Sequence, residues 1–113
     1  EICVFEVFGD TIVAGESAEV GAGLHAFRDP VAPEDFATSR VPIDVSRFHT
    51  YGLEWTPDEV SFSVDGRLLR TCPTPPRYPM QVMLAVFDFP ERGGPGDAAH
   101  VPNLVVDRIR ETP

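Results

Sequence analysis

The chain has 113 residues, 42% of them hydrophobic, which suits one globular domain that buries roughly 60% of its unfolded surface on folding. No stretch approaches the roughly 20 apolar residues of a membrane span, and no charged start or apolar signal core is visible, so we expect a soluble protein. The net charge of −9, with nine arginines and no lysine, argues against a nucleic-acid partner and suits a neutral or cationic ligand.

The first predicted element is the strand "CVFEVF", which is rich in β-branched and aromatic residues. Residues 18–27, "AEVGAGLHAF", alternate more weakly, and their glycines indicate a bulge or the close approach of a ligand. Residues 28–47 contain three prolines and several acidic residues. We predict a long surface loop there rather than a helix.

The clearest strand pattern covers residues 48–71, "FHTYGLEWTPDEVSFSVDGRLLRT". Its first strand presents four aromatic or apolar residues on one face: His49, Tyr51, Leu53 and Trp55. Its second strand alternates three apolar residues with serines: Val60, Phe62 and Val64. Asp65-Gly66 follows as a strong hairpin signal, so the pattern predicts a meander with one apolar face.

A proline-rich loop over residues 72–79 separates this meander from "MQVMLAVFDF" at residues 80–89, a nearly continuous apolar run typical of a strand buried on both faces. The glycine-rich residues 91–102 predict a flexible loop, and "NLVVDRIRET" at 103–112 predicts a last strand. With about seven strands and no convincing helix, the predicted fold class is all-β, an antiparallel β-sandwich or jelly roll.

Two cysteines, Cys3 and Cys72, fit no metal-ligand spacing and are too few for a disulfide scaffold. They could pair, but we expect two free or buried thiols. No glycine-rich phosphate loop precedes a helix, so nothing suggests a nucleotide cofactor.

The run over residues 48–71, followed by "YPMQVMLAVFDFP" and "LVVDRIR", resembles the C-terminal half of family 16 of the glycoside hydrolases, the laminarinase- and lichenase-like β-glucanases. In that family a Phe-His-x-Tyr strand leads into a Glu/Asp-Trp-x-Pro turn, a Val-Asp-Gly hairpin and a Pro-Met strand. The family signature, Glu-x-Asp-x-x-Glu, is matched by the opening "EICVFE" at both glutamates. The resemblance implies a concanavalin-like jelly roll in which residues 1–113 form the catalytic strand and the C-terminal portion, with the N-terminal half absent.

Retaining cleavage of a glycosidic bond needs two carboxyls about 5–5.5 Å apart. On a regular strand Glu1 and Glu6 face opposite sides, so they share a cleft only if the strand contains a bulge. By resemblance, Glu1 would be the nucleophile and Glu6 the acid/base, with Cys3 where the family carries an aspartate. An aspartate helps to hold two such carboxyls at different pKa values, whereas burial would raise the pKa of a cysteine above ~8.5 and keep it neutral.

Three further residues are candidates for substrate binding. His25 matches a family histidine on the strand beside the signature, where it could hydrogen-bond substrate, and the alternative is a structural histidine. Phe87 matches an aromatic position that gives sugars a stacking platform, and the alternative is a core phenylalanine. Trp55 is expected to be a core or rim residue rather than a ligand contact. We expect no cofactor, although some family members bind a structural Ca²⁺ whose ligands this sequence does not place.

The first functional hypothesis is a secreted, retaining endo-β-1,3(4)-glucanase that acts on β-glucan as a monomer or as part of a longer chain. The second is a non-catalytic or degenerate β-sandwich that binds carbohydrate, because Cys3 replaces the signature aspartate and Ala85 replaces a polar asparagine frequent in the family. The third is an unrelated immunoglobulin-like sandwich of about seven strands, which the length permits.

Overall fold

The computed structural model describes residues 1–92 and 101–113 and divides into two compact units. The first unit is Glu1–Tyr78 and the second is Pro79–Pro113, and each is described by itself. The organisation of residues 1–113 as a single domain stays a prediction.

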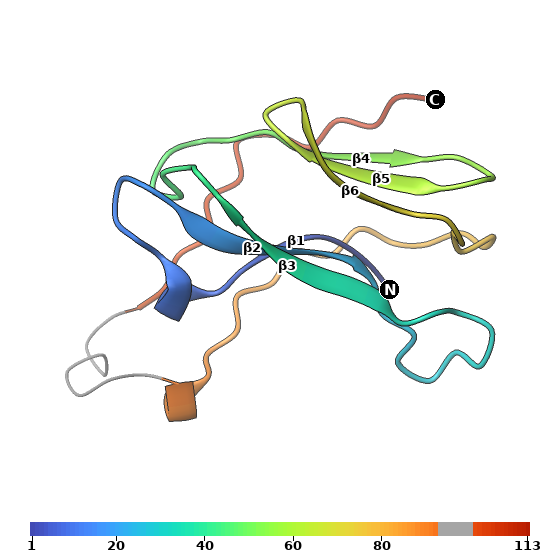
Figure 1. The fold of residues 1–113 in the computed structure, drawn as a ribbon, viewed down its shortest axis with the longest axis horizontal. Coiled ribbons are helices and arrows are strands. Elements are labelled where there is room, and N and C mark those ends of the chain that lie inside the picture. The colour runs from blue at the N-terminus through green and yellow to red at the C-terminus, as the bar shows by residue number, and fades with distance from the viewer. Residues whose placement is uncertain (93–100) are drawn as a thin grey trace. The chain divides into compact units, whose positions relative to one another are not determined.

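The first sheet consists of three antiparallel strands in the order β1-β2-β3 (Figure 1). β1 covers Ile2–Val7 and β2 covers Ala18–Leu24, and the short 3-10 helix η1, Gly9–Thr11, lies between them in the chain. Both strands were predicted from their apolar residues. β2 is the central strand, and six of its seven residues are buried.

The edge strand β3, Asp35–Val41, lies where the sequence predicted a loop. Its seven residues all pair with β2, and positions 37–40 are exposed. Polar and charged residues on an edge strand oppose unwanted pairing with other chains, but they also remove the apolar alternation by which a strand is recognised. The loop prediction for residues 28–47 is therefore wrong over 35–41.

The second sheet has the order β4-β5-β6, with strands Tyr51–Trp55, Val60–Val64 and Arg67–Cys72. It confirms the predicted meander. Asp65 has φ 49° and Gly66 has φ 77°, so both adopt the left-handed conformation that a tight two-residue hairpin turn requires. The predicted Asp-Gly hairpin is therefore confirmed.

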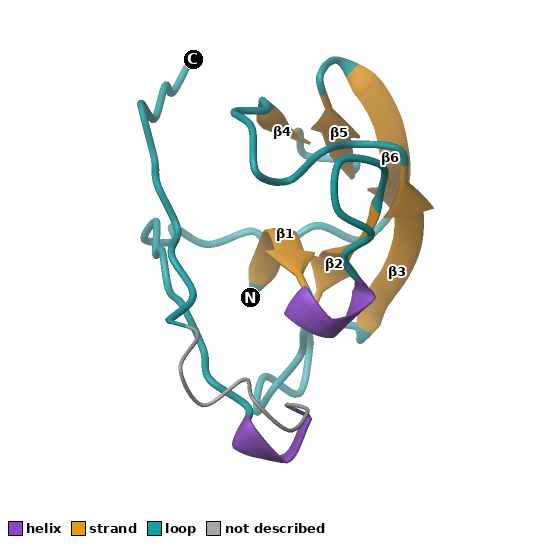
Figure 2. Cartoon of the chain, turned by 90° about the vertical axis from the view of Figure 1, so that its left-hand side faces the viewer, coloured by secondary structure: helices purple, strands orange, loops and turns teal. Residues whose placement is uncertain are grey.

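The two sheets enclose the core (Figure 2), to which β2 and β5 contribute most of the fully buried side chains. One cluster joins Ala22 and Leu24 of the first sheet to Val60, Phe62 and Cys72 of the second. The serines that alternate with the buried residues of β5 are only partly buried. The apolar face predicted for the meander is thus the face that packs on the first sheet.

Arg70 provides a polar link between the sheets. Its Nη1 donates to the backbone carbonyl of Ala22 at 3.0 Å, and its Nη2 forms a short ion pair with Asp35. Cys72 lies nearby, and burial raises the pKa of its thiol to about 11. Cys3 and Cys72 are both free, which confirms the expectation of two thiols.

His49 joins the Asp65-Gly66 turn to the loop before β4. Its Nδ1 lies 2.8 Å from an Asp65 carboxylate oxygen and its Nε2 lies 2.8 Å from the carbonyl oxygen of Asp44. The hydrogen bond to Asp65 is the main cause of a raised His49 pKa. The pKa of Asp65 is lowered, first by the backbone N–H of Thr50 and then by His49.

These two opposite shifts predict a pH window for stability. The raised pKa of His49 gives stability that is complete below the unfolded value of about 6.5 and is lost as pH rises through the folded value. The lowered pKa of Asp65 gives stability present above about 3.9 and lost as pH falls through its folded value. In thermal melts, His49→Gln should therefore lower Tm more at pH 5.5 than at pH 9. Equal losses at both pH values would contradict this.

The second unit contains the 3-10 helix η2, Pro90–Arg92, and no strand among its described residues. The strands predicted at 80–89 and 103–112 are wrong, because these residues are exposed and unpaired in any ladder. Phe87, for example, is 69% exposed. An apolar sequence forms a strand only where another strand satisfies its backbone hydrogen bonds. The predicted loop at 91–102 falls largely on residues 93–100, outside the described residues.

The all-β fold class is confirmed, since two antiparallel three-stranded sheets account for the regular structure of the first unit. Within residues 1–92 and 101–113, no helix has the length and apolar character needed to cross a membrane.

Candidate active site

A β-bulge in β1 brings Glu1, Cys3 and Glu6 to one face of the first sheet. Cys3 pairs with Gly23 of β2, and Glu6 pairs with Gly21, so three steps along β1 match two steps along β2. The extra residue reverses the alternation of side chains, which a regular strand would keep. The bulge on which the sequence prediction depended is therefore present in the strand.

The electrostatic surroundings of Cys3 agree with this arrangement. Burial, followed by the negative charges of Glu6 and then Glu1, raises the pKa of the Cys3 thiol to about 12. Both carboxylates thus lie near enough to Cys3 to interact with it. The thiol is neutral at physiological pH, as predicted from the sequence.

We predict that Cys3 reacts slowly with iodoacetamide at pH 8. Its thiolate is about 10³-fold scarcer than that of an ordinary thiol, a deficit partly offset by greater intrinsic nucleophilicity, so alkylation should be roughly 100-fold slower than for glutathione. Peptide mapping by mass spectrometry measures this rate. Glu6→Gln should speed the reaction, because Glu6 is the stronger of the two charge effects, and an unchanged rate would contradict the shared face.

Two glycines of β2, Gly21 and Gly23, leave the middle of this face without side chains from β2. The tip of the Phe36 ring occupies the place of a side chain at Gly21, 2.4 Å from where its Cβ would be. At Gly23, with φ 142°, a Cβ would lie 2.2 Å from the Asp35 carbonyl oxygen. Glycine is therefore required at Gly23, while a side chain at Gly21 would have to displace the Phe36 ring. The sequence had indicated a bulge or the close approach of a ligand, and it is β3 of the protein itself that approaches these glycines.

His25 follows β2 and lies beside Glu1 in the extended ladder. The His25 N–H donates to the Glu1 carbonyl at 3.0 Å, and the Glu1 nitrogen donates to the His25 carbonyl at 2.7 Å. The His25 Nδ1 lies 2.6 Å from a Glu34 carboxylate oxygen, and its ring stacks on Phe36 with centroids 4.3 Å apart. This histidine is thus placed next to one of the predicted catalytic carboxylates.

Sequence reasoning missed Glu34 and Phe36 as members of this face. Both residues fall within the surface loop predicted over residues 28–47. The pairing of β3 with β2 puts Phe36 opposite Gly23. No local signal in residues 34–38 reveals this, because the placement depends on the pairing of β3 with β2.

Of the other two predicted substrate-binding residues, Trp55 lies in the second sheet and Phe87 in the second unit. Trp55 ends β4 in the second sheet, is 40% exposed, and donates its indole N–H to the Pro76 carbonyl at 3.1 Å, as expected of a rim residue. Phe87 belongs to the second unit, where its ring lies 6.2 Å from that of Phe89.

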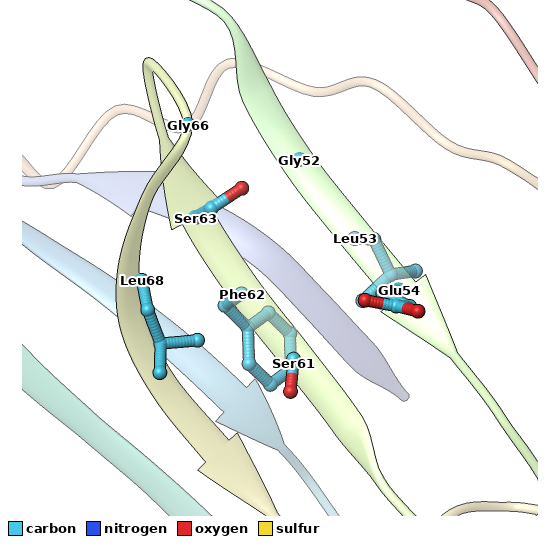
Figure 3. Close-up of a pocket in the computed structure, with 8 residues that line it drawn as sticks. All are labelled: Gly52, Leu53, Glu54, Ser61, Phe62, Ser63, Gly66 and Leu68. Atoms are coloured by element: carbon cyan, nitrogen blue, oxygen red, sulfur yellow. The ribbon is translucent and has the colours of Figure 1, made fainter.

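A hollow of about 300 Å³ lies on the second sheet (Figure 3). Its polar lining includes Ser61 and Ser63, and its apolar lining includes the exposed Leu68. The Ser63 hydroxyl fills the place of a side chain at Gly52. The lining contains neither Glu1 nor Glu6 nor His25. The candidate active site is therefore the face of the first sheet that carries Glu1, Cys3 and Glu6.

The structural Ca²⁺ considered from the family resemblance stays an expectation whose ligands are not placed. Within the described parts of the chain, no three or more His, Cys, Asp and Glu side chains are grouped so that they could hold a metal ion.

The comparison with protein families gives one match, "Glycosyl hydrolases family 16", over residues 35–96. No curated protein and no solved structure matches the chain. The matched range runs from β3 through the whole second sheet and covers more than half of the sequence, although it does not include Glu1–Glu6. It excludes the unrelated immunoglobulin-like sandwich. The chain therefore belongs to family 16 of the glycosyl hydrolases.

Proposed function

We propose that this protein hydrolyses β-1,3- or mixed β-1,3(4)-linked glucan internally and with retention of anomeric configuration. The observation that carries the proposal is the β1 bulge, which gives Glu1 and Glu6 a common face despite an odd separation in sequence. Family membership supports a glycosidase with a carbohydrate substrate. The subtype and the identity of the two catalytic residues are part of the proposal.

In the proposed reaction the two carboxyls divide the chemistry. Glu6 gives its proton to the glycosidic oxygen while the Glu1 carboxylate attacks the anomeric carbon, so the sugar–oxygen bond breaks as a glycosyl ester forms. Glu6, now ionised, takes a proton from water, and the resulting hydroxide equivalent displaces Glu1. Two inversions at one carbon give net retention.

Glycine at positions 21 and 23 supports the same reading. Because Gly21 carries no side chain, the tip of the Phe36 ring lies over it, beside the strand that carries the acids. His25 and Phe36 offer a polar ring edge and an apolar surface beside it. Such a mixture of stacking surface and polar groups is typical of sites that bind neutral ligands.

The experiment is an assay of reducing-end release by the purified full chain from laminarin and lichenan, with xylan as a β-1,4-linked control. Proton NMR of the first products distinguishes retention from inversion. We expect release from laminarin or lichenan, initial β-anomers, and little from xylan. Initial α-anomers would contradict the double displacement, and activity on xylan alone would contradict the substrate class.

A second function, binding of glycans without turnover, is favoured by one observation. Cys3 is a neutral thiol where the family carries an acid, so it cannot share a proton with the neighbouring carboxyls as an aspartate does. This reading predicts that laminarin binds without being cleaved and that Cys3→Asp restores cleavage. Hydrolysis by the wild type would rule it out.

The proposed location is outside the cell, where polymeric β-glucan is found. Recovery of the native protein from the culture medium of its host tests this. Retention inside the cells would contradict it.

A further inference from the structure

Three side chains form a row across the sheet beside β1: Glu1, His25 and Glu34. Glu1 and His25 exchange both backbone hydrogen bonds, so they are directly opposed. Leu24 pairs with Asp35, which places the next position, His25, opposite Glu34. Directly opposed residues of antiparallel strands project their side chains to one face, with Cβ atoms about 4.5–5.5 Å apart. His25 therefore has Glu1 on one side and Glu34 on the other.

Glu34 is anchored by both of its carboxylate oxygens. Oε1 lies 2.6 Å from His25 Nδ1, and Oε2 accepts the backbone N–H of Ala26 at 2.8 Å. These bonds, that of Ala26 first, lower the pKa of Glu34, so the carboxylate is ionised and only accepts. The proton between the two residues is therefore carried by Nδ1 of His25.

The His25 ring has little freedom left once Nδ1 is held. It stacks on Phe36 with an interplanar angle of 27°, and Phe27, whose φ is 48°, lies with its ring centroid 5.3 Å away. An imidazole held at Nδ1 presents Nε2 on the far side of the ring. Among the described residues, no protein group bonds to this Nε2, which in the neutral ring is a bare acceptor.

We propose that Glu34 is a positioning residue that keeps the proton of His25 on Nδ1 and so directs Nε2 away from Glu34. Nε2 then accepts a hydrogen bond from a hydroxyl of the sugar bound beside Glu1. This inference rests on the proposed function, because it names the sugar hydroxyl as the group that His25 binds. Glu34 itself does not touch the sugar. Its effect passes through the tautomer and orientation of one imidazole ring.

Loss of Glu34 has a specific chemical consequence. A glutamine at position 34 can either accept from Nδ1–H or donate to a bare Nδ1, so the proton is free to occupy either nitrogen. In the Nε2–H form the ring donates instead of accepting, so a sugar hydroxyl that donated to it must accept instead and redirect its own proton. Hydrogen bonds to sugar hydroxyls strengthen in the transition state of retaining hydrolysis, so kcat should respond.

The first test is the tautomer of His25 in nitrogen NMR of histidine-labelled protein at a pH where the ring is neutral. The His25→Gln spectrum identifies the resonance. We expect the Nδ1–H form in the wild type and in Glu16→Gln, which removes an equal charge from an exposed turn. In Glu34→Gln we expect a mixture or the Nε2–H form. An Nε2–H wild type, or an unchanged tautomer in Glu34→Gln, overturns the inference.

The second test is kinetic. Glu34→Gln should lower kcat/KM on laminarin about 10-fold, mainly through kcat, with a Tm equal to that of Glu16→Gln. In the double variant with His25→Gln, loss of Glu34 should cost nothing further, because its effect acts through the ring. Additive losses, or a fall in Tm without a kinetic change, indicate a merely structural role and overturn the inference.

A wild type that hydrolyses no glucan contradicts the proposed function separately. In that case the inference is decided by the tautomer and by the shift of the His25 resonance on addition of a β-1,3-gluco-oligosaccharide. A shift in the wild type that Glu34→Gln weakens supports it. A resonance that the oligosaccharide does not move overturns it.

Discussion

Glu1→Gln and Glu6→Gln are each expected to reduce kcat on laminarin by about 10²- to 10⁴-fold while the protein stays folded. Glutamine keeps the size of the side chain but neither attacks the anomeric carbon nor delivers a proton. Both residues lie at the surface-facing side of β1, so the core is not disturbed. Reducing-end release, with circular dichroism as the folding check, measures the effect. Glu16→Gln, in an exposed turn, is the matched control and should retain full activity.

Azide separates the two roles. In Glu1→Ala, azide can attack the anomeric carbon from the side that the carboxylate has left, which gives an α-glycosyl azide. In Glu6→Ala with an aryl β-glucoside, whose leaving group needs no acid, azide attacks the glycosyl-enzyme and gives the β-azide. The reverse pattern would exchange the roles of the two residues. Full activity in both glutamine variants would disprove the proposed pair.

Phe62→Ala should lower the free energy of unfolding by about 3–5 kcal/mol, the largest stability effect we expect from one core substitution. Phe62 is fully buried and contacts residues of both sheets, so its removal leaves a cavity between them. Since small domains have a total stability of about 5–15 kcal/mol, the variant could be largely unfolded at 37 °C.

Urea titration followed by circular dichroism measures this loss. Ser63→Ala, the next position in β5 and on its opposite face, is the control and should change stability by about 0.5 kcal/mol or less. A loss below about 1 kcal/mol for Phe62→Ala would mean that the two sheets do not share one packed core.

The second sheet could be predicted almost completely because its signals are local. Alternation of Val60, Phe62 and Val64 with serines identifies the buried face, and Asp65-Gly66 supplies the two left-handed residues of the turn. Neither signal depends on distant parts of the chain. The hairpin follows from eight or so neighbouring residues, each of which favours the same structure.

The errors arose where structure depends on a partner rather than on local pattern. β3 is a polar edge strand that exists through its pairing with β2, so its own sequence gives no alternation to detect. Residues 80–89 show the converse, an apolar run without a described partner strand. Backbone pairing, and not side-chain character alone, decides both cases.

The sequence proposes residues for the candidate site but does not reveal what lies beside them. Glu1, Glu6 and His25 could be named from spacing and family resemblance. Glu34 and Phe36 enter the site only because β3 pairs with β2, which the sequence did not reveal. The register that places them opposite His25 and Gly23 is a property of the sheet as a whole.

The irregular step in β1 has a consequence for how this motif tolerates change. Glu1 and Glu6 are five positions apart, an odd interval, and one surplus residue between Cys3 and Glu6 gives their side chains a shared orientation. Removing a single residue there would leave both acids in the chain yet turn one of them toward the interior. The number of residues between Glu1 and Glu6 is therefore constrained as strongly as the identity of the two side chains. A conservative replacement of Val4 is tolerable, whereas its deletion is equivalent to losing a carboxyl group.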